Sequence, residues 1–301
     1  MRVALVLVSF LAAVAIVVAW VERGETPPHL TTPRAELEAG GDRAEDETLG
    51  RGLHLAGSGS NLVVTRALAA AYRTSRPNDR VVVHDSIGST GGVRAVASGA
   101  IAIGLVARPL RPAERELGLS VVGYARVPIT FLAHPDVRDG DISSDEIVRS
   151  LRGESVPWRD GTPRVWLLRE RGDAGSAVVA SRIEGFGDAE EDAIATRRFR
   201  VVYHDDELTR AILGLRGGLG IADLAQARAN APTARVLAVD GRMPSVVAVS
   251  DGSYPFFKDL SFVVRNAEDP SVARFLAFAT SEQARQVIAS AGAAALPLEA
   301  P

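Results

Sequence analysis

The sequence contains no cysteine and a single lysine, Lys258, and each shortage excludes particular chemistry. Without cysteine the chain can form no disulfide, thiol nucleophile, cysteine-bound metal site or lipid-modified N-terminal cysteine. Without further lysines it has no Gly-Lys-Ser/Thr phosphate loop, and no Schiff-base chemistry is available away from Lys258. The basic residues are therefore almost all arginines.

The chain also has little net charge. A formal net charge of -3 and a pI near 6.0 give no overall attraction for nucleic acid or for an anionic membrane, although a local group of arginines can still bind a small anion. With 301 residues, of which 47% are hydrophobic and 24% charged, the composition is that of a globular protein with one or two domains. We expect no nucleic-acid partner, and any anion site must be local.

The motifs of common enzyme classes are missing. No stretch matches the Gly-x-Ser-x-Gly nucleophile elbow, and Gly57-Ser58-Gly59 lacks the third glycine of a dinucleotide fingerprint because Leu62 stands in its place. The histidines are scattered and have no metal-ligand spacing. We therefore expect no catalytic residue, no cofactor and no metal. A hydrolase that uses Ser58 or Ser89 is the least favoured alternative, because no motif positions a base.

A long hydrophobic run begins the chain. Residues 3–21 contain one polar side chain, that of Ser9, and this length approaches the roughly 20 residues that cross a bilayer as a helix. Residues 1–21 are therefore predicted to be a signal peptide or a membrane anchor, and the sequence leaves both open. Residues 22–51 are polar and rich in proline, glycine and acids, which predicts a flexible linker. We expect export to the periplasm or to the extracytoplasmic face of the cytoplasmic membrane.

Short apolar runs alternate with amphipathic segments from residue 53 onward. This alternation predicts βαβ units and a parallel sheet. Strands are expected at 53–57, 81–85, 101–107, 164–168, 199–204, 235–240 and 260–265, and helices at 61–72, 91–98, 270–279 and 281–291. A long apolar run lies at 121–135.

Polar residues mark several predicted helix starts. Ser144 is expected to cap a helix that continues through acidic residues, and Thr280 with Gln283 has the spacing of a capping box. The acidic run 205–207 also lies where a helix should begin, so we interpret it as helix capping and complementation of the helix dipole rather than as a metal site.

Two turns rich in glycine, serine and threonine carry the chemistry. They lie at 57–61 and 86–92, each at a point where a predicted strand meets a helix. The first N–H groups of a helix lack intrahelical partners and its dipole favours negative charge there, so such turns can bind an anion. The alternative is that Ser60, Asn61 and Thr90 only cap helices. A third segment, 107–110, follows the next strand, and the combination of three favours a binding site.

These segments resemble a known family. In order and spacing, LAGSGSNL at 55–62 and SIGSTGGVRAVASGAIAIGLVARPL at 86–110 are similar to the opening lobe of the phosphate-binding proteins of ABC importers. The resemblance extends over about 52–298 and includes GGLGIADL at 217–224. It implies an α/β type II periplasmic binding protein fold with the ligand between two lobes, each a mainly parallel sheet flanked by helices, after an N-terminal hydrophobic helix. Lobe one would comprise 52–126 plus 259–301, and lobe two 127–258.

The resemblance also implies which residues bind the ligand. One set lies in the two turns and the segment after them: Ser58, Gly59, Ser60, Asn61, Ser89, Thr90, Gly91 and Arg108. Arg108 fits the Arg-Pro-Leu signature of the family, and Arg169 corresponds to the arginine of the second lobe.

Two departures from the family pattern concern ligand specificity. Ala107 stands where the family usually has a hydroxyl or carboxylate that contacts the anion, and the Ser-Gly-Thr loop that follows the arginine is missing after Arg169. Asp173 falls near the lost serine. A carboxylate there can accept the proton of monohydrogen phosphate or repel a fully ionised anion, and the sequence leaves both open.

We therefore expect a non-catalytic, monomeric solute-binding protein. It would capture phosphate or a related small oxyanion, close its lobes and deliver the ligand to the permease subunits of an ABC importer. The alternative is a membrane-tethered sensory or protein-interaction module that keeps the fold but binds anions weakly or not at all, as Ala107 and the missing loop allow.

Overall fold

Residues 52–297 are described by a computed structural model. The predicted hydrophobic segment, residues 1–21, and the predicted linker, 22–51, lie outside the described residues. No helix within 52–297 is long and apolar enough to cross a membrane.

Eight strands form the main path of the sheet in the described residues. Their order is β2-β1-β3-β10-β4-β8-β6-β7. In chain order these strands are β1 (Leu53–Gly57), β2 (Val81–Ser86), β3 (Ile103–Val106), β4 (Ser120–Ala133), β6 (Val165–Arg169), β7 (Arg200–Val202), β8 (Gly218–Asp223) and β10 (Phe257–Val264). The short strands β5 (Asp141–Ile142), β9 (Arg235–Val239) and β11 (Ala294–Ala295) pair off this path.

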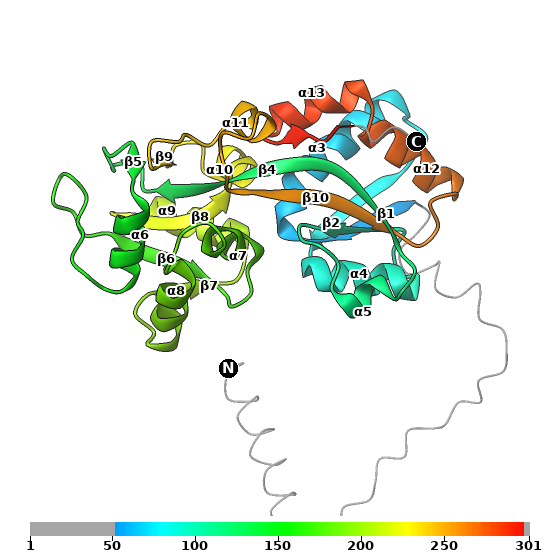
Figure 1. The fold of residues 1–301 in the computed structure, drawn as a ribbon. Helices are drawn as coiled ribbons and strands as arrows, with labels where there is room; N and C mark the ends of the chain where they lie inside the picture. Colours follow the sequence, from blue (N-terminus) through cyan, green and yellow to red (C-terminus); the bar gives the residue numbers. More distant parts are fainter. Residues whose placement is uncertain (1–51, 298–301) are drawn as a thin grey trace, which may run out of the picture. The chain divides into compact units, whose positions relative to one another are not determined.

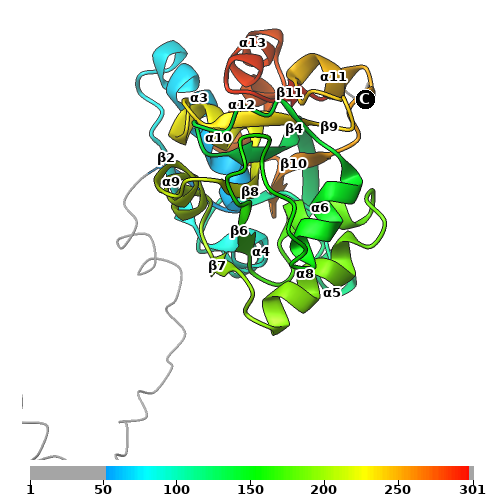
Figure 2. The same cartoon turned by 90° about the vertical axis from the view of Figure 1, so that its left-hand side faces the viewer.

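Helices pack beside both groups of strands (Figures 1 and 2). Those beside β1, β2 and β3 are α3 (Gly59–Ser75), α4 (Gly88–Ser98), α5 (Pro112–Arg115), α12 (Pro270–Ala279) and α13 (Glu282–Ser290). Those that follow β4 along the chain are α6 (Ser144–Leu151), α7 (Ala174–Ala180), α8 (Phe186–Ala195), α9 (Asp205–Gly214), α10 (Leu224–Asn230) and α11 (Val246–Ser250).

The pairing directions confirm the predicted βαβ units. Strand β1 pairs in parallel with β2 and β3, and β6 pairs in parallel with β7 and β8. The long strand β4 instead pairs antiparallel with β10 along its first part and with β8 along its second part, so it belongs to both groups (Figure 1). The α/β fold that the sequence predicted is therefore present, whereas the residue boundaries assigned to the two lobes stay a prediction.

Two large hydrophobic cores lie under these layers. The first contains Leu55, Leu68, Phe262 and Phe275, and the second contains Phe131, Trp158 and Trp166. Phe262 and Phe275 are fully buried in the first core. Helix α10 follows β8, a strand of the second group, yet its residue Ala225 belongs to the first core. The helix α10 therefore packs against α3.

Two predicted helix caps are wrong by one residue. Ser143 caps α6, because its backbone is extended and its side chain accepts a hydrogen bond from Glu146 N–H, while Ser144 is the first helical residue. In α13 the capping side chain is that of Ser281, which accepts from Ala284 N–H, so the predicted box of Thr280 and Gln283 is not formed. Adjacent serine and threonine residues look equivalent in a sequence, and the local backbone angle decides which one caps.

Two glycines allow α4 to lie directly against the sheet. A Cβ atom on Gly57, whose φ is 150°, would come within 2.2 Å of Leu105 O, and one on Gly92 would come within 2.9 Å of Gly57 Cα. Only glycine at both positions permits this approach. It brings the start of α4 close to the start of α3, which places the two predicted binding turns on the same edge of the sheet.

Candidate functional site

The first predicted turn forms the start of α3. Ser58 occupies the N-cap position and donates its backbone N–H to Leu105 O. Ser60 is buried, and its Oγ accepts a hydrogen bond of 2.7 Å from Lys258 Nζ. The turn therefore joins a hydroxyl and the first N–H groups of a 17-residue helix to a buried ammonium group.

Lys258 forms a buried ion pair at this place. Its Nζ lies 2.9 Å from Asp223 Oδ1, and the exposed fractions of the two side chains are 5% and 2%. Burial alone would lower the pKa of Lys258, but Asp223, Asp173 and Asp205 raise it above its ordinary value, so the ammonium stays charged. The sequence analysis did not assign Lys258 to the site. Its one available signal was that it is the single lysine of an arginine-rich chain.

Asn61 points into the first core instead of toward the turn. Its Nδ2 donates to Val106 O and to the hydroxyl of Tyr124, which also bonds to Thr65. All three side chains are buried, and burial raises the pKa of Tyr124. The Asn61 side chain therefore fastens α3 to β3 and β4. Its predicted contact with an anion, through the backbone or otherwise, stays a prediction.

The second predicted turn contacts the segment that follows β3. Ser89 Oγ accepts from Ala107 N–H at 3.4 Å, and Thr90 Oγ1 accepts from Arg108 Nη2 at 3.0 Å. Gly91 lies against Ile87, since a Cβ atom there would stand 3.1 Å from the Ile87 side chain. The three segments that the sequence singled out are thus brought together in the structure.

Arg108 is engaged by an acidic partner. Its two terminal nitrogens donate to Glu114 Oε2 and Oε1 at 2.7 and 2.8 Å, which is the bidentate geometry of a strong pair. The Arg108 guanidinium lowers the pKa of Glu114 to about 2. Arg108 therefore positions Thr90 in the second turn, and its direct contact with an anion stays a prediction.

Arg169 lies at the end of β6 and is 7% exposed. Its Nη1 is 2.6 Å from Asp205 Oδ1, its Nε is 3.2 Å from Glu170 Oε2, and its Nη2 donates to Tyr203 O at 3.1 Å. Burial alone would lower the pKa of Arg169, but Asp205, followed by Asp173 and Glu170, raises it above its ordinary value. Arg169, the cation predicted for the second lobe, is therefore already paired with carboxylates of the protein.

Asp173 is the N-cap of α7. Its Oδ1 accepts from Gly175 N–H at 2.9 Å and from Ser176 N–H at 3.0 Å, and its Oδ2 lies 3.8 Å from Arg169 Nη2. One carboxylate oxygen is thus used by the helix start, and the other faces the arginine. Asp173 thus lies beside Arg169, and its contact with a ligand stays a prediction.

Arg169 and Lys258 line one small cavity. The other lining residues are Asp173, Gly175, Asp205, Ile221, Ala222 and Asp223. The free space inside is ≈ 10 Å³, which is about what one water molecule requires. Three of the lining residues are aspartates, and Asp205 and Asp223 were not predicted as site residues. Asp205 was interpreted only as part of a helix start, because its partners come from distant parts of the chain.

The cavity brings cations and carboxylates together. In residues 52–297 no group of three or more histidine, aspartate or glutamate side chains is arranged to hold a metal ion. The polar groups that converge are the two cations, the carboxylates of the three aspartates, the Ser60 hydroxyl and the start of α3. This set can hold an oxyanion through charge-assisted hydrogen bonds.

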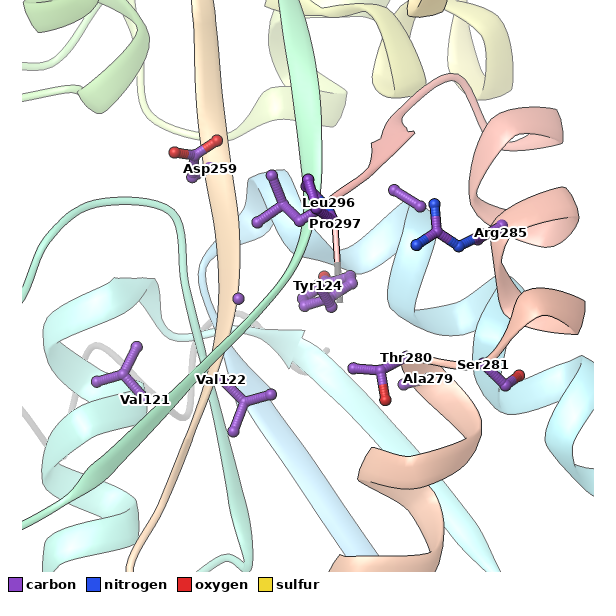
Figure 3. Close-up of a pocket in the computed structure, with 12 residues that line it drawn as sticks. Val121, Val122, Tyr124, Asp259, Ala279, Thr280, Ser281, Arg285, Leu296 and Pro297 are labelled. Atoms are coloured by element: carbon purple, nitrogen blue, oxygen red, sulfur yellow. The ribbon is translucent and has the colours of Figure 1, made fainter. Parts of the chain in front are cut away.

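A larger groove of ≈ 800 Å³ lies away from this site (Figure 3). It is bordered by β4 at Val122 and Tyr124, by the turn between α12 and α13 at Thr280, and by Leu296 near the end of the described chain. Arg285 and Asp259 supply its charged groups. None of the predicted binding residues lines it, so it does not belong to the anion site.

The fold and the site define a class of protein. An α/β fold with two groups of parallel strands, linked by the long strand β4, is the type II periplasmic binding protein fold. The chain belongs to the PBP superfamily, whose domain matches residues 35–283.

Relatives of this class include phosphate receptors. The chain is 22% identical over 227 residues to the phosphate-binding protein PstS of Borreliella burgdorferi, which covers 71% of this chain and 80% of that protein. A putative phosphate ABC transporter substrate-binding protein from Clostridium perfringens, solved with bound phosphate, superposes with a TM-score of 0.71 at 20% identity, covering 82% of this chain and 100% of that chain. An ABC-type phosphate transport receptor from Vibrio cholerae gives 0.58 at 15% identity, with 81% and 100% covered.

Proposed function

We propose that the protein captures phosphate or a related oxyanion between its two lobes. The observation that carries this proposal is that Arg169 and Lys258, both buried, line one cavity, where Lys258 also bonds to Ser60 at the start of α3. A buried guanidinium and a buried ammonium beside a helix N-terminus offer an anion both charge and hydrogen-bond donors. The low exposure of both cations means that water competes weakly for them.

The carboxylates around the cations favour an oxyanion that carries a proton. Asp173, Asp205 and Asp223 line the cavity, and an ionised carboxylate can only accept hydrogen bonds. Monohydrogen phosphate can donate its proton to such a group, whereas sulfate is fully ionised and has nothing to donate. We infer that phosphate binds more tightly than sulfate. Ala107 supplies no side-chain hydrogen bond, so the donors on the first-lobe side are Ser60, Ser89, Thr90 and backbone N–H groups.

The setting of this function is also a proposal. The family, together with the phosphate transport relatives, supports a role as the extracytoplasmic binding component of an ABC importer, which hands the ligand to permease subunits. The hydrophobic run at 3–21 supports export, either with cleavage or as an anchored protein. Each molecule would act as a monomer and without catalysis, because binding and lobe closure suffice for delivery.

Calorimetric titration of the purified full chain tests the proposal. We expect phosphate to bind, sulfate to bind at least about tenfold more weakly, and Arg169→Gln to abolish binding of both. The matched control is Arg171→Gln. Arg171 lies two residues from Arg169 in the sequence and pairs with exposed Glu191, so its replacement should leave binding unchanged. No heat with any anion, or equal loss in both variants, would contradict the proposal.

A sensory or protein-interaction module is a second candidate. The observation that favours it is that the cavity is small and that Arg169 and Lys258 are already paired with carboxylates. A protein of this kind would give no heat with phosphate, and its full-length form would be recovered from membranes with a defined protein partner. Retention of that partner by Arg169→Gln would support this candidate over import.

A further inference from the structure

Asp205 joins two elements that carry the site. It is the first residue of α9, and its Oδ1 lies 2.6 Å from Arg169 Nη1. Its Oδ2 lies against the first residue of α3, because a Cβ atom built on Gly59 would stand 2.3 Å from that oxygen. One carboxylate therefore spans from the buried arginine to the start of a helix that belongs to the other core.

A carboxylate at this position is stabilised by the same positive groups that would stabilise an external oxyanion. The N-terminus of the 17-residue helix α3 attracts negative charge, and the guanidinium of Arg169 adds a full positive charge with directed donors. Asp205 also acts on two further charged members of the site, since it adds to the effect of burial in raising the pKa of Asp223 and helps to raise that of Lys258. Its charge is thus felt by Arg169, Lys258 and Asp223 together.

Little free space is left at this position. With Asp205 in place the cavity beside Arg169 and Lys258 holds ≈ 10 Å³, room for about one water molecule. A tetrahedral oxyanion has five non-hydrogen atoms and does not fit in the volume of one water. Gly59 contributes as well, because only a residue without a side chain lets the carboxylate approach the helix start.

We propose that Asp205 is a built-in anionic ligand: its carboxylate occupies the oxyanion position between Arg169 and the start of α3, and an incoming oxyanion must displace it. The competition rests on the proposed function, whereas the occupancy of the helix start by Asp205 does not. Without any ligand, the Asp205 carboxylate pairs with Arg169 and lies against Gly59.

Competition of this kind sets the affinity. If the site is open to ligand only in the fraction of molecules in which Asp205 has turned away, the apparent dissociation constant is the intrinsic one divided by that fraction. Removing the carboxylate therefore tightens anion binding, although it takes away an acidic group of the site. If Asp205 only supported the structure of the site, its removal would instead weaken anion binding.

The test compares three full-length variants. Asp205→Ala removes the carboxylate, Asp205→Asn keeps its shape without the charge in case the first variant folds poorly, and Asp206→Asn is the matched control. Asp206 is the next residue of α9, is largely exposed and pairs with Arg210 on its own helix. Titration with inorganic phosphate measures competition. Hydrogen exchange of the amides at 59–61 measures whether the start of α3 is covered in phosphate-free buffer.

We expect Asp205→Ala or Asp205→Asn to bind phosphate at least about tenfold more tightly than the unmodified chain and to exchange those amides faster, with protection restored by phosphate. The control should match the unmodified chain in both measurements. Weaker or unchanged phosphate affinity together with unchanged exchange overturns the proposal. If no variant binds phosphate, the proposed function fails. Faster exchange in the Asp205 variants alone then supports the built-in ligand, and unchanged exchange rejects it.

Discussion

Lys258 Nζ donates a 2.7 Å hydrogen bond to Ser60 Oγ, across 198 positions of the sequence. The lysine lies on β10, the long strand that pairs with β3 and β4, and the serine lies in the first turn of α3. Asp223, at the end of β8, forms an ion pair with the same ammonium group. The ammonium thus connects three elements at the place where an anion would bind.

Replacement of Lys258 by methionine should destabilise the fold strongly. The change leaves the carboxylate of Asp223 buried without its cation, which costs on the order of 3–5 kcal/mol of unfolding free energy. The double variant Lys258→Met with Asp223→Asn removes both charges and should recover much of that loss. Urea denaturation measures the three free energies. A single-variant loss below about 1 kcal/mol would show that the pair is not desolvated.

Glu190 should make the protein less stable as the pH rises. Burial raises the pKa of Glu190 from its ordinary 4.5 to about 7, with Ser176 as its hydrogen-bond partner. The folded state therefore holds a proton that the unfolded state has released between pH 4.5 and 7, so the unfolding free energy falls across this window by up to roughly 3 kcal/mol.

The matched variants are Glu190→Gln and Glu191→Gln. Glutamine at 190 should flatten the difference between pH 5 and pH 8 and should be the more stable protein at pH 8. Glu191 pairs with exposed Arg171, and its variant should keep the pH dependence of the unmodified chain. Equal pH dependence in all three proteins would refute the assignment to Glu190.

A variant of Arg108 can show whether this residue supports the structure or contacts the ligand. Because both terminal nitrogens bind Glu114, Arg108→Lys breaks the bidentate pair and should cost about 1–2 kcal/mol of stability. Phosphate affinity should change by less than about threefold, since both terminal nitrogens of Arg108 are already bonded to Glu114 or Thr90. Calorimetry and thermal unfolding measure the two effects. Intact stability with lost affinity would instead make Arg108 an anion-binding residue.

The same pair predicts acid sensitivity. Arg108 holds the pKa of Glu114 at about 2, below its ordinary 4.5, so the stabilisation is complete above pH 4.5 and is lost as the pH falls toward 2. Glu114→Gln should remove this part of the acid transition, as followed by circular dichroism. An identical acid transition in the variant would count against the pair.

Two helical glycines should respond in opposite directions to alanine. A Cβ atom at Gly92 would lie 2.9 Å from Gly57 Cα, so Gly92→Ala should cost about 1–3 kcal/mol through overpacking against β1. Gly187 in α8 has its nearest neighbour at 3.5 Å, and Gly187→Ala should be neutral or stabilising by up to about 1 kcal/mol. Equal effects at the two positions, measured by urea denaturation, would contradict the close packing of α4.

Much of the fold follows from local pattern. The alternation of apolar runs with amphipathic segments located the strands of both groups, and the turn at 57–61 lies at the start of α3 as expected. The caps of α6 and α13 were missed by one residue, because neighbouring hydroxyl residues differ only in backbone angle.

The site was predictable only in part. Ser60 and Arg169 were predicted from resemblance, whereas Lys258, Asp205 and Asp223 were not. Their roles depend on the register of β10 against β4 and on how α9 meets α3, and neither follows from local periodicity. Asp205 also has an ordinary explanation as a helix start, and a sequence cannot show that its carboxylate reaches Arg169.

A crystal structure of the full chain grown with phosphate tests the central claim most directly. The account predicts an anion within hydrogen-bond distance of Arg169 and of the start of α3 at Ser60, with the Asp205 carboxylate turned away from Arg169. A structure grown in excess phosphate in which Asp205 still binds Arg169 and no anion lies beside Lys258 would contradict it.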